Sequence, residues 1–88
     1  MSNTVQSAMT STILRLPAVR ERSGLSRSTI YQRIIDGLWP KPVNLGPRAV
    51  GWPASELDAL NNARIAGSTD SEIRALVVKL EAARKAAA

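Results

Sequence analysis

Apolar side chains recur at helical spacing in the stretch "GLSRSTIYQRIIDG", residues 24–37. Ile30 and Ile34 stand four residues apart and so share one face of a helix, while polar side chains fill the opposite face. The hydroxyl of Ser26 is placed to accept an N–H of the first turn, and Gly37 marks the exit of the helix. The pattern predicts a capped helix with a narrow buried stripe and a broad polar face.

A shorter helix is predicted just before this one. Pro17 suits a first helical turn, because the N–H that proline lacks would have no partner there, and Gly24 suits the left-handed residue that ends a helix. We therefore expect a helix over about residues 17–23, with "SGLS" as the turn between the two helices. Two helices joined in this way form the unit whose second helix enters the major groove of DNA.

After these helices the period changes from helical to alternating. The two prolines of "WPKP" prevent the helix from continuing. The alternation in "VNL" and "VGW" predicts two short strands joined by the tight connection "GPR". A hairpin of this size is not stable alone, so we expect it to lean on the helices as a wing.

A third helix is predicted over about residues 54–66. Leu57 and Leu60 supply a loose helical period, and Ser55 is its expected N-cap. Its expected role is to close the core beneath the wing.

The last predicted helix follows Gly67 and carries a second apolar stripe. Thr69 and Glu72 fit a capping box at its start. Two heptads are too few for an autonomous coiled coil, so the stripe must dock on its own domain or on a neighbouring subunit. Surface ion pairs are expected between residues four apart, namely Asp70 with Arg74 and Glu81 with Lys85. The side chains predicted to mediate self-association are Ile73, Leu76, Val77 and Leu80.

These elements divide the chain into three parts. Residues 1–12 are rich in Ser and Thr without any period, which predicts a disordered arm. Residues 13–66 form the predicted winged helix-turn-helix domain, and residues 67–88 form a C-terminal helix that is the candidate oligomerisation element. The predicted fold class is mainly α with a small β-hairpin wing.

Composition narrows the chemistry. The 88 residues include no Cys and no His, which argues against disulfides, thiolate catalysis, most zinc sites and the commonest general base. The acidic residues fall mostly on predicted helix surfaces, and no glycine-rich phosphate loop is present. Neither a signal-like start nor a long apolar run occurs. We therefore expect a cytoplasmic binding protein rather than an enzyme, without metal, cofactor, small-molecule ligand or membrane partner.

The net charge of +5 is unevenly placed. Residues 13–52 hold seven basic and two acidic side chains, and so account for the whole excess. Such a confined excess favours a polyanion as partner. The chain has two Trp, one Tyr and no Phe, too few aromatic rings for a platform that stacks single-stranded bases. Double-stranded DNA is therefore the expected polyanion.

Two groups of side chains are the candidates for DNA contact. An ordinary amphipathic helix with a solvated polar face would look similar, but the turn, the cap and the confined charge together favour a helix that contacts bases. Arginine can pair bidentately with guanine and glutamine with adenine, and a cation on a wing can contact phosphates or the minor groove. Tyr31 suits the core as well as a phosphate contact. The helical candidates are Ser26, Arg27, Ser28, Thr29, Tyr31, Gln32 and Arg33, and the wing candidates are Lys41 and Arg48.

The segments "GLSRSTIY", "PKPV" and "LGPRAVGW", in this order within residues 13–60, resemble the AlpA-type phage regulators. These are a branch of the MerR-like winged helix-turn-helix group that includes excisionases. The resemblance implies DNA binding by the helix from Ser26 to Arg33, with the hairpin around Arg48 as the wing. It also implies a mobile element, whose excision genes such proteins activate or whose excision they direct by lining up on DNA and bending it for an integrase.

We therefore expect a sequence-specific double-stranded DNA-binding protein of a prophage or integrative element. It would act as an excisionase or as an AlpA-like transcription regulator, with cooperative self-association and an integrase as a further partner. Two alternatives stay open. One is the DNA-recognition subunit of a phage packaging terminase, and the other is a protein-interaction adaptor or antitoxin whose basic surface meets an acidic partner.

Overall fold

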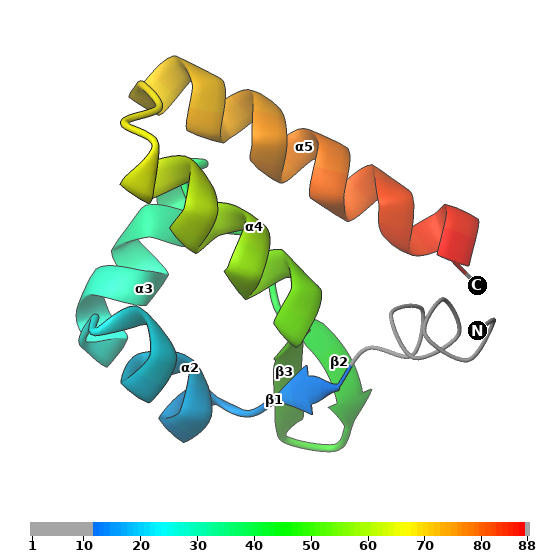
Figure 1. Ribbon diagram of the computed structural model, residues 1–88. Coiled ribbons are helices and arrows are strands. Elements are labelled where there is room, and N and C mark those ends of the chain that lie inside the picture. Colours follow the sequence, from blue (N-terminus) through cyan, green and yellow to red (C-terminus); the bar gives the residue numbers. More distant parts are fainter. Residues whose placement is uncertain (1–11, 88) are drawn as a thin grey trace, which may run out of the picture.

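The computed structural model describes residues 12–87, so the expected disordered arm lies, apart from Thr12, outside the described residues. The fold is mainly helical with one small antiparallel sheet, as predicted, and is compatible with a winged helix-turn-helix followed by a C-terminal helix. Figure 1 shows the sheet at one end of the helices and the last helix lying beside the one before it. In chain order the elements are β1 (Ile13–Leu14), α2 (Leu16–Ser23), α3 (Arg27–Ile35), β2 (Val43–Gly46), β3 (Ala49–Pro53), α4 (Ala54–Ile65) and α5 (Asp70–Ala87).

The predicted signals between α2 and α3 are confirmed. Gly24 ends α2 in the left-handed conformation, with a φ of 75°. The Ser26 side chain caps α3 by accepting the N–H of Thr29 at 3.2 Å. Val19 of α2 and Ile30 of α3 are both fully buried in one core, and Ile30 lies on the face that the pattern predicted to be buried.

The sheet contains a strand that the sequence pattern did not predict. Its order is β1-β3-β2, and β1 pairs with β3 so that Leu14 lies opposite Trp52. A Cβ added at Gly51 would lie 2.6 Å from Ile13 Cγ2 and 2.9 Å from Leu14 O. Glycine at this position is therefore what lets β1 approach β3. A two-residue strand has too short an alternation to be recognised from sequence.

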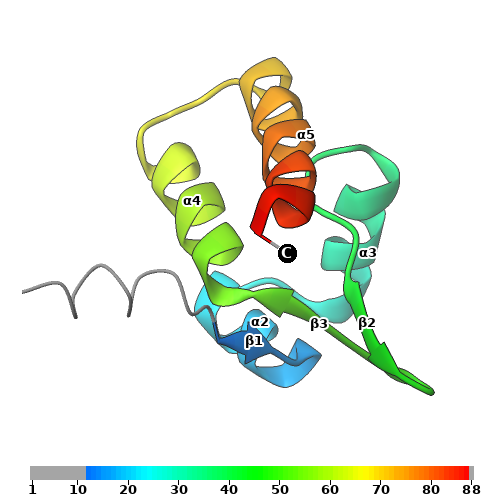
Figure 2. The same cartoon turned by 90° about the vertical axis from the view of Figure 1, so that its right-hand side faces the viewer.

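The strands β2 and β3 form the predicted wing. The connection Pro47–Arg48 lies at its tip, and Arg48 has a φ of 58°. Proline followed by a left-handed residue is the arrangement of a type II turn. The Asn44 side chain accepts the Gly46 N–H at 3.0 Å and supports the irregular register next to the turn. In Figure 2 the hairpin extends beyond the helices, on the side of the molecule that α3 also occupies.

Helix α4 begins directly from β3, so the predicted cap was wrong. Pro53, and not Ser55, occupies the N-cap position. The last residue of β3 is also Pro53, which pairs with Ile13, and the Ala54 N–H donates to Thr12 O at 2.7 Å. The carbonyl oxygen of Thr12, just before β1, thus satisfies one of the first N–H groups of the helix, which have no partner within the helix.

Helix α5 docks on its own domain. Ile73 is 0% exposed and Val77 is 5% exposed, whereas Leu76 and Leu80 are partly buried against the same core. Ile73 and Val77 therefore pack within their own domain, and self-association through the stripe of α5 stays a prediction. The physical reason is that a small domain needs this apolar surface to complete its own core. The core consists of Leu14, Val19, Ile30, Trp39, Trp52, Leu57, Leu60, Ile73 and Val77.

Candidate nucleic-acid interface

The polar face of α3 is exposed along its length. Ser28 and Gln32 are exposed, while Ile30 on the opposite face is fully buried, and Arg27 is exposed at the first turn. The helix thus has one apolar stripe in the core and one polar face turned to solvent. Of the other candidates on this segment, Ser26 is exposed, and the partly buried ones are Thr29, Tyr31 and Arg33.

The hydroxyls at the start of α3 are engaged with one another. Ser26 Oγ accepts the Thr29 N–H and lies 2.9 Å from Thr29 Oγ1 and 3.3 Å from Ser28 Oγ. This cluster holds the first turn of the helix in place. Ser26 and Thr29 therefore shape the start of the helix, and Ser28 presents its hydroxyl beside them.

Tyr31 connects the exposed face of α3 to the core. The Arg27 guanidinium lies 5.6 Å from the centre of the Tyr31 ring, a cation–π distance. The Tyr31 ring also meets the Trp52 ring in an edge-on arrangement, with ring centres 6.4 Å apart and an interplanar angle of 70°. Because Trp52 is fully buried, this stack links the orientation of Arg27 to a rigid part of the fold.

Gln32 lies in the middle of the exposed face. Its Nε2 donates to Asp36 Oδ1 at 3.2 Å, one turn further along the helix. A hydrogen bond between two exposed side chains contributes little to stability, so the amide can exchange this partner for another at low cost. Gln32 is therefore held in a defined position without being committed to the fold.

Ile35 is a member of this face that the sequence interpretation missed. It is 77% exposed, although it is a large apolar side chain. Ser28, Gln32 and Ile35 follow one another at spacings of four and three, so they share one stripe of α3. The period that places Ile30 and Ile34 inward could have revealed this, because a third isoleucine next to Ile34 cannot lie on the same face.

The two wing candidates lie in different parts of the fold. Arg48 is exposed at the tip of the hairpin. Lys41 is exposed too, but it lies before β2, in the segment of residues 36–42 that joins α3 to the wing, which we term the connector. Lys41 therefore lies beside the wing rather than on it.

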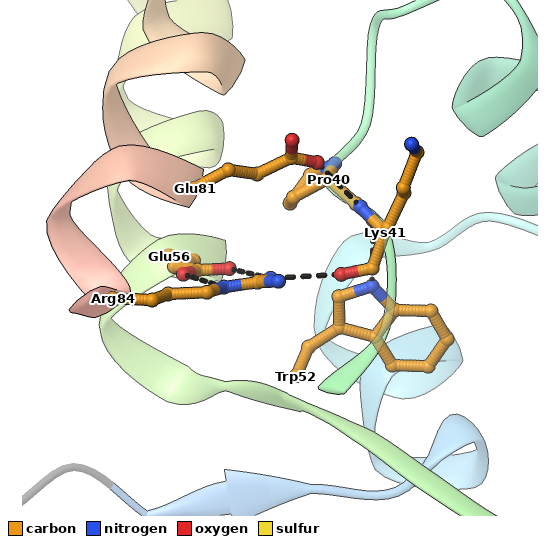
Figure 3. Close-up of polar contacts among 6 residues, drawn as sticks. All are labelled: Pro40, Lys41, Trp52, Glu56, Glu81 and Arg84. Carbon is orange, nitrogen blue, oxygen red and sulfur yellow. Dashed lines mark hydrogen bonds and ion pairs between the residues drawn. The ribbon is translucent and has the colours of Figure 1, made fainter. Parts of the chain in front are cut away.

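A buried ion pair joins α4 to α5 beside the connector. Glu56 is 4% exposed and accepts two hydrogen bonds from Arg84, from Nε at 2.7 Å and from Nη2 at 2.6 Å. These bonds raise the pKa of Arg84 above its ordinary value, against the opposing effect of burial. Figure 3 shows the pair together with Lys41, whose carbonyl oxygen also accepts from Arg84 Nη2 at 2.8 Å.

The sequence interpretation placed these charges incorrectly. Glu56 was expected on a helix surface, and Glu81 was expected to pair with Lys85. Instead Glu81 accepts the backbone N–H of Lys41 at 2.8 Å. Likewise, Asp70 pairs with Arg64 at 3.4 Å rather than with the residue four positions later. Spacing along one helix does not indicate such partners, because they come from segments far away in the chain.

Two further findings concern the part of the chain that the structure describes. Residues 12–87 bring no three metal-ligating side chains together. None of the described helices is both long and apolar enough to cross a membrane.

Comparison with known proteins points to phage regulators. The family model described as "Prophage CP4-57 regulatory protein (AlpA)" matches residues 12–65. The chain is 50% identical over 54 residues to the uncharacterized protein ORF88 of Enterobacteria phage P4. The matched region covers 61% of each chain. It is 42% identical over 52 residues to the DNA-binding transcriptional activator AlpA of Escherichia coli K12. This matched region covers 52% of this chain and 74% of that protein. No solved structure matches. The family match runs from β1 to α4, and α5 lies outside it.

Proposed function

This chain belongs to the family of the prophage regulatory protein AlpA, and from that premise we propose that it is a sequence-specific double-stranded DNA-binding protein. Its task would be to regulate a mobile element, as a transcription regulator, as an excisionase, or as both. The observation that carries the proposal is the exposed polar face of α3, whose opposite face is anchored in the core. A relative is named as a DNA-binding transcriptional activator, which supports the same function.

In this proposal α3 lies in the major groove. Arg27 pairs with a guanine edge, Gln32 with an adenine edge, and Ser28 with either. Ile35 continues the same stripe and makes an apolar contact with a thymine methyl group. The stack of Arg27 on Tyr31 supports these roles, because it restricts the arginine before DNA arrives and so lowers the entropy lost on binding.

The wing supplies contacts that do not depend on base sequence. Arg48 holds a left-handed φ that glycine would adopt more easily, so the tip has an arginine despite some backbone strain. We propose that its cation contacts phosphates or the minor groove next to the site of α3. The remaining candidates would contact or orient phosphates near the groove, namely Ser26, Thr29, Tyr31, Arg33 and Lys41.

Several subunits would act together on DNA. A single module of this size covers only about 600 to 1,000 Å² of interface, which favours cooperative binding of neighbours on adjacent sites. Because Ile73 and Val77 lie in the core, contact between subunits would use the outer side of α5, where Val78 is 68% exposed. DNA bending and contact with an integrase complete the excisionase form of the proposal.

The test compares two arginines on two duplexes. The first duplex is recovered by selection from a random pool, and the second is its scrambled form. We expect Arg27→Ala to lose about 1–3 kcal/mol on the selected duplex and much less on the scrambled one. Arg48→Ala keeps a non-glycine residue at the left-handed position and removes the cation with its stem, so it should weaken both complexes equally and lower the salt slope by about 1.

Lys79→Ala is the matched control, since Lys79 is an exposed cation of α5. Equal losses on both duplexes for Arg27→Ala would refute base reading by that residue. If the wild-type chain binds every duplex only at millimolar concentration in moderate salt, the DNA-binding proposal fails and the adaptor alternative gains. Excision frequency and promoter activity in cells then separate the excisionase role from the regulatory role.

A further inference from the structure

Helix α5 is hydrogen-bonded to the connector at both ends, and each of these hydrogen bonds is to a backbone atom of the connector. At the end near α3, Arg74 Nε donates to Asp36 O at 2.9 Å. At the end near the wing, Glu81 Oε2 accepts the Lys41 N–H and Arg84 Nη2 donates to Lys41 O, each at 2.8 Å. Contacts of this kind determine the path of the chain itself rather than the position of one side chain.

The three contacting side chains lie on one face of α5. Arg74, Glu81 and Arg84 are separated by seven and three residues, which brings them to the same side of a helix. A Cβ built at Gly37 would lie 3.7 Å from Arg74 Cγ, so the arginine stem passes directly over the connector. The helix therefore runs along the connector and does not merely touch it at one point.

This face of α5 is itself held in a defined place. Ile73 anchors the helix in the core, and the Arg84 guanidinium is bound by the buried carboxylate of Glu56 in α4. From the other side, Trp52 Nε1 in β3 donates to Pro40 O at 2.8 Å (Figure 3). The connector is thus bonded both to α5 and to the sheet, between the exposed face of α3 and the wing.

We propose that α5 is a positioning element for duplex binding, in which Arg74, Glu81 and Arg84 set the wing relative to α3. The inference rests on the proposed function, because it assumes that α3 and Arg48 meet the same duplex. It extends beyond the family match, which ends before α5 begins. None of the three side chains needs to touch DNA for this role, so they are positioning residues.

The first experiment measures the geometry without DNA. The chain contains no cysteine, so Ser28→Cys and Pro47→Cys place one spin label on α3 and one on the wing tip. Pulsed EPR then reports the distribution of distances between the labels. We expect a narrow distribution, which broadens when Arg74→Ala and Glu81→Ala are added together. Glu81→Gln alone should leave it narrow, because the amide oxygen still accepts the Lys41 N–H.

The second experiment is a double-mutant cycle on the selected duplex. Arg74→Ala and Glu81→Ala together leave the net charge unchanged, so a simple electrostatic effect on DNA affinity cancels. We expect this pair of substitutions to weaken DNA binding. When Arg48→Ala is added to the pair, we expect the affinity for DNA to change by no more than about twofold. Glu81→Ala alone is a more discriminating test, because the two explanations predict opposite changes in DNA affinity. Loss of an acidic group should tighten DNA binding by charge alone, whereas loss of positioning weakens it.

Lys79→Ala is the control in both experiments, and thermal melts confirm that each variant is folded. An unchanged distance distribution in the Arg74/Glu81 variant overturns the proposal. So does an additive cycle, in which Arg48→Ala costs the same factor with and without the α5 contacts. If the wild-type chain does not bind DNA, the proposed function fails while the EPR result still decides whether α5 positions the wing.

Discussion

Helices α3 and α5 have the same design and use their polar faces in different ways. Each begins at a side-chain cap, Ser26 in α3 and Thr69 in α5, and each places an apolar stripe in one common core. The polar face of α3 bonds within its own helix and is otherwise turned to solvent. The polar face of α5 contacts the backbone of the connector and the buried Glu56.

The difference shows what an amphipathic pattern can and cannot indicate. The apolar stripe of a helix predicts which side is buried, because burial of apolar area is non-directional and depends only on spacing. The fate of the polar side depends on whether distant donors and acceptors come within hydrogen-bonding distance. In α5 they do, and α5 is therefore part of the fold, whereas α3 keeps its polar face available for a ligand.

The largest effect should come from the same truncation made on each helix. Ile73→Ala removes a fully buried side chain of α5 and should cost about 2–5 kcal/mol of unfolding free energy. Ile35→Ala removes an exposed side chain of α3 and should change stability by no more than about 0.5 kcal/mol. Urea unfolding followed by tryptophan fluorescence measures both. Similar losses for the two variants would contradict the contrast between the helices.

A smaller loss is expected when the ion pair of α5 is broken. Arg84→Met leaves the Glu56 carboxylate buried without its partner and should cost about 2 kcal/mol, below the usual range for buried pairs because Arg84 keeps some exposure. The double variant with Glu56→Gln should recover part of that loss, since the stranded charge is then gone. Thermal melts of the single and double variants test this, and a double variant worse than Arg84→Met would count against it.

Titration of Arg84 should not change the stability that the ion pair contributes at ordinary pH. The folded pKa of Arg84 is raised, so its contribution is fully present below the unfolded arginine pKa and is lost only as the pH rises through the folded value.

The smallest effect concerns Ile35 on DNA. If it contacts a thymine methyl group, replacing that thymine with uracil should weaken wild-type binding by about 0.8 kcal/mol, roughly fourfold. Ile35→Ala should bind the two duplexes alike. Affinities for a series of selected duplexes with single uracil replacements measure this. If no thymine position distinguishes wild type from Ile35→Ala, the methyl contact is refuted while the arginine and glutamine roles stand.

Local signals predicted the helices and the wing because the physics behind them is local. A serine hydroxyl caps α3, Gly24 takes a left-handed φ, and Thr69 with Glu72 forms both bonds of the capping box. Each of these depends on atoms within three or four residues. Gln32 was found in the same way, from a period that turns it away from Ile30, and Arg27 was found from its place in the first turn after the cap.

The features that the sequence did not reveal all depend on contacts between distant segments. β1 exists because Gly51 leaves room for it, and the first N–H of α4, that of Ala54, donates to the carbonyl oxygen of Thr12. The pair of Glu56 with Arg84 spans 28 positions, and the bond from Arg84 to Lys41 spans 43. No spacing rule covers such distances.

The sequence by itself therefore determined the helices, the two wing strands, the caps of α3 and α5 and the buried faces of those two helices, since these follow from steric and hydrogen-bonding preferences of neighbouring residues. Only the tertiary structure decided that α5 belongs to the same domain as α3 and bonds to the connector. A charged side chain has many partners within reach of an unfolded chain, and packing of the apolar stripes selects which of them it meets.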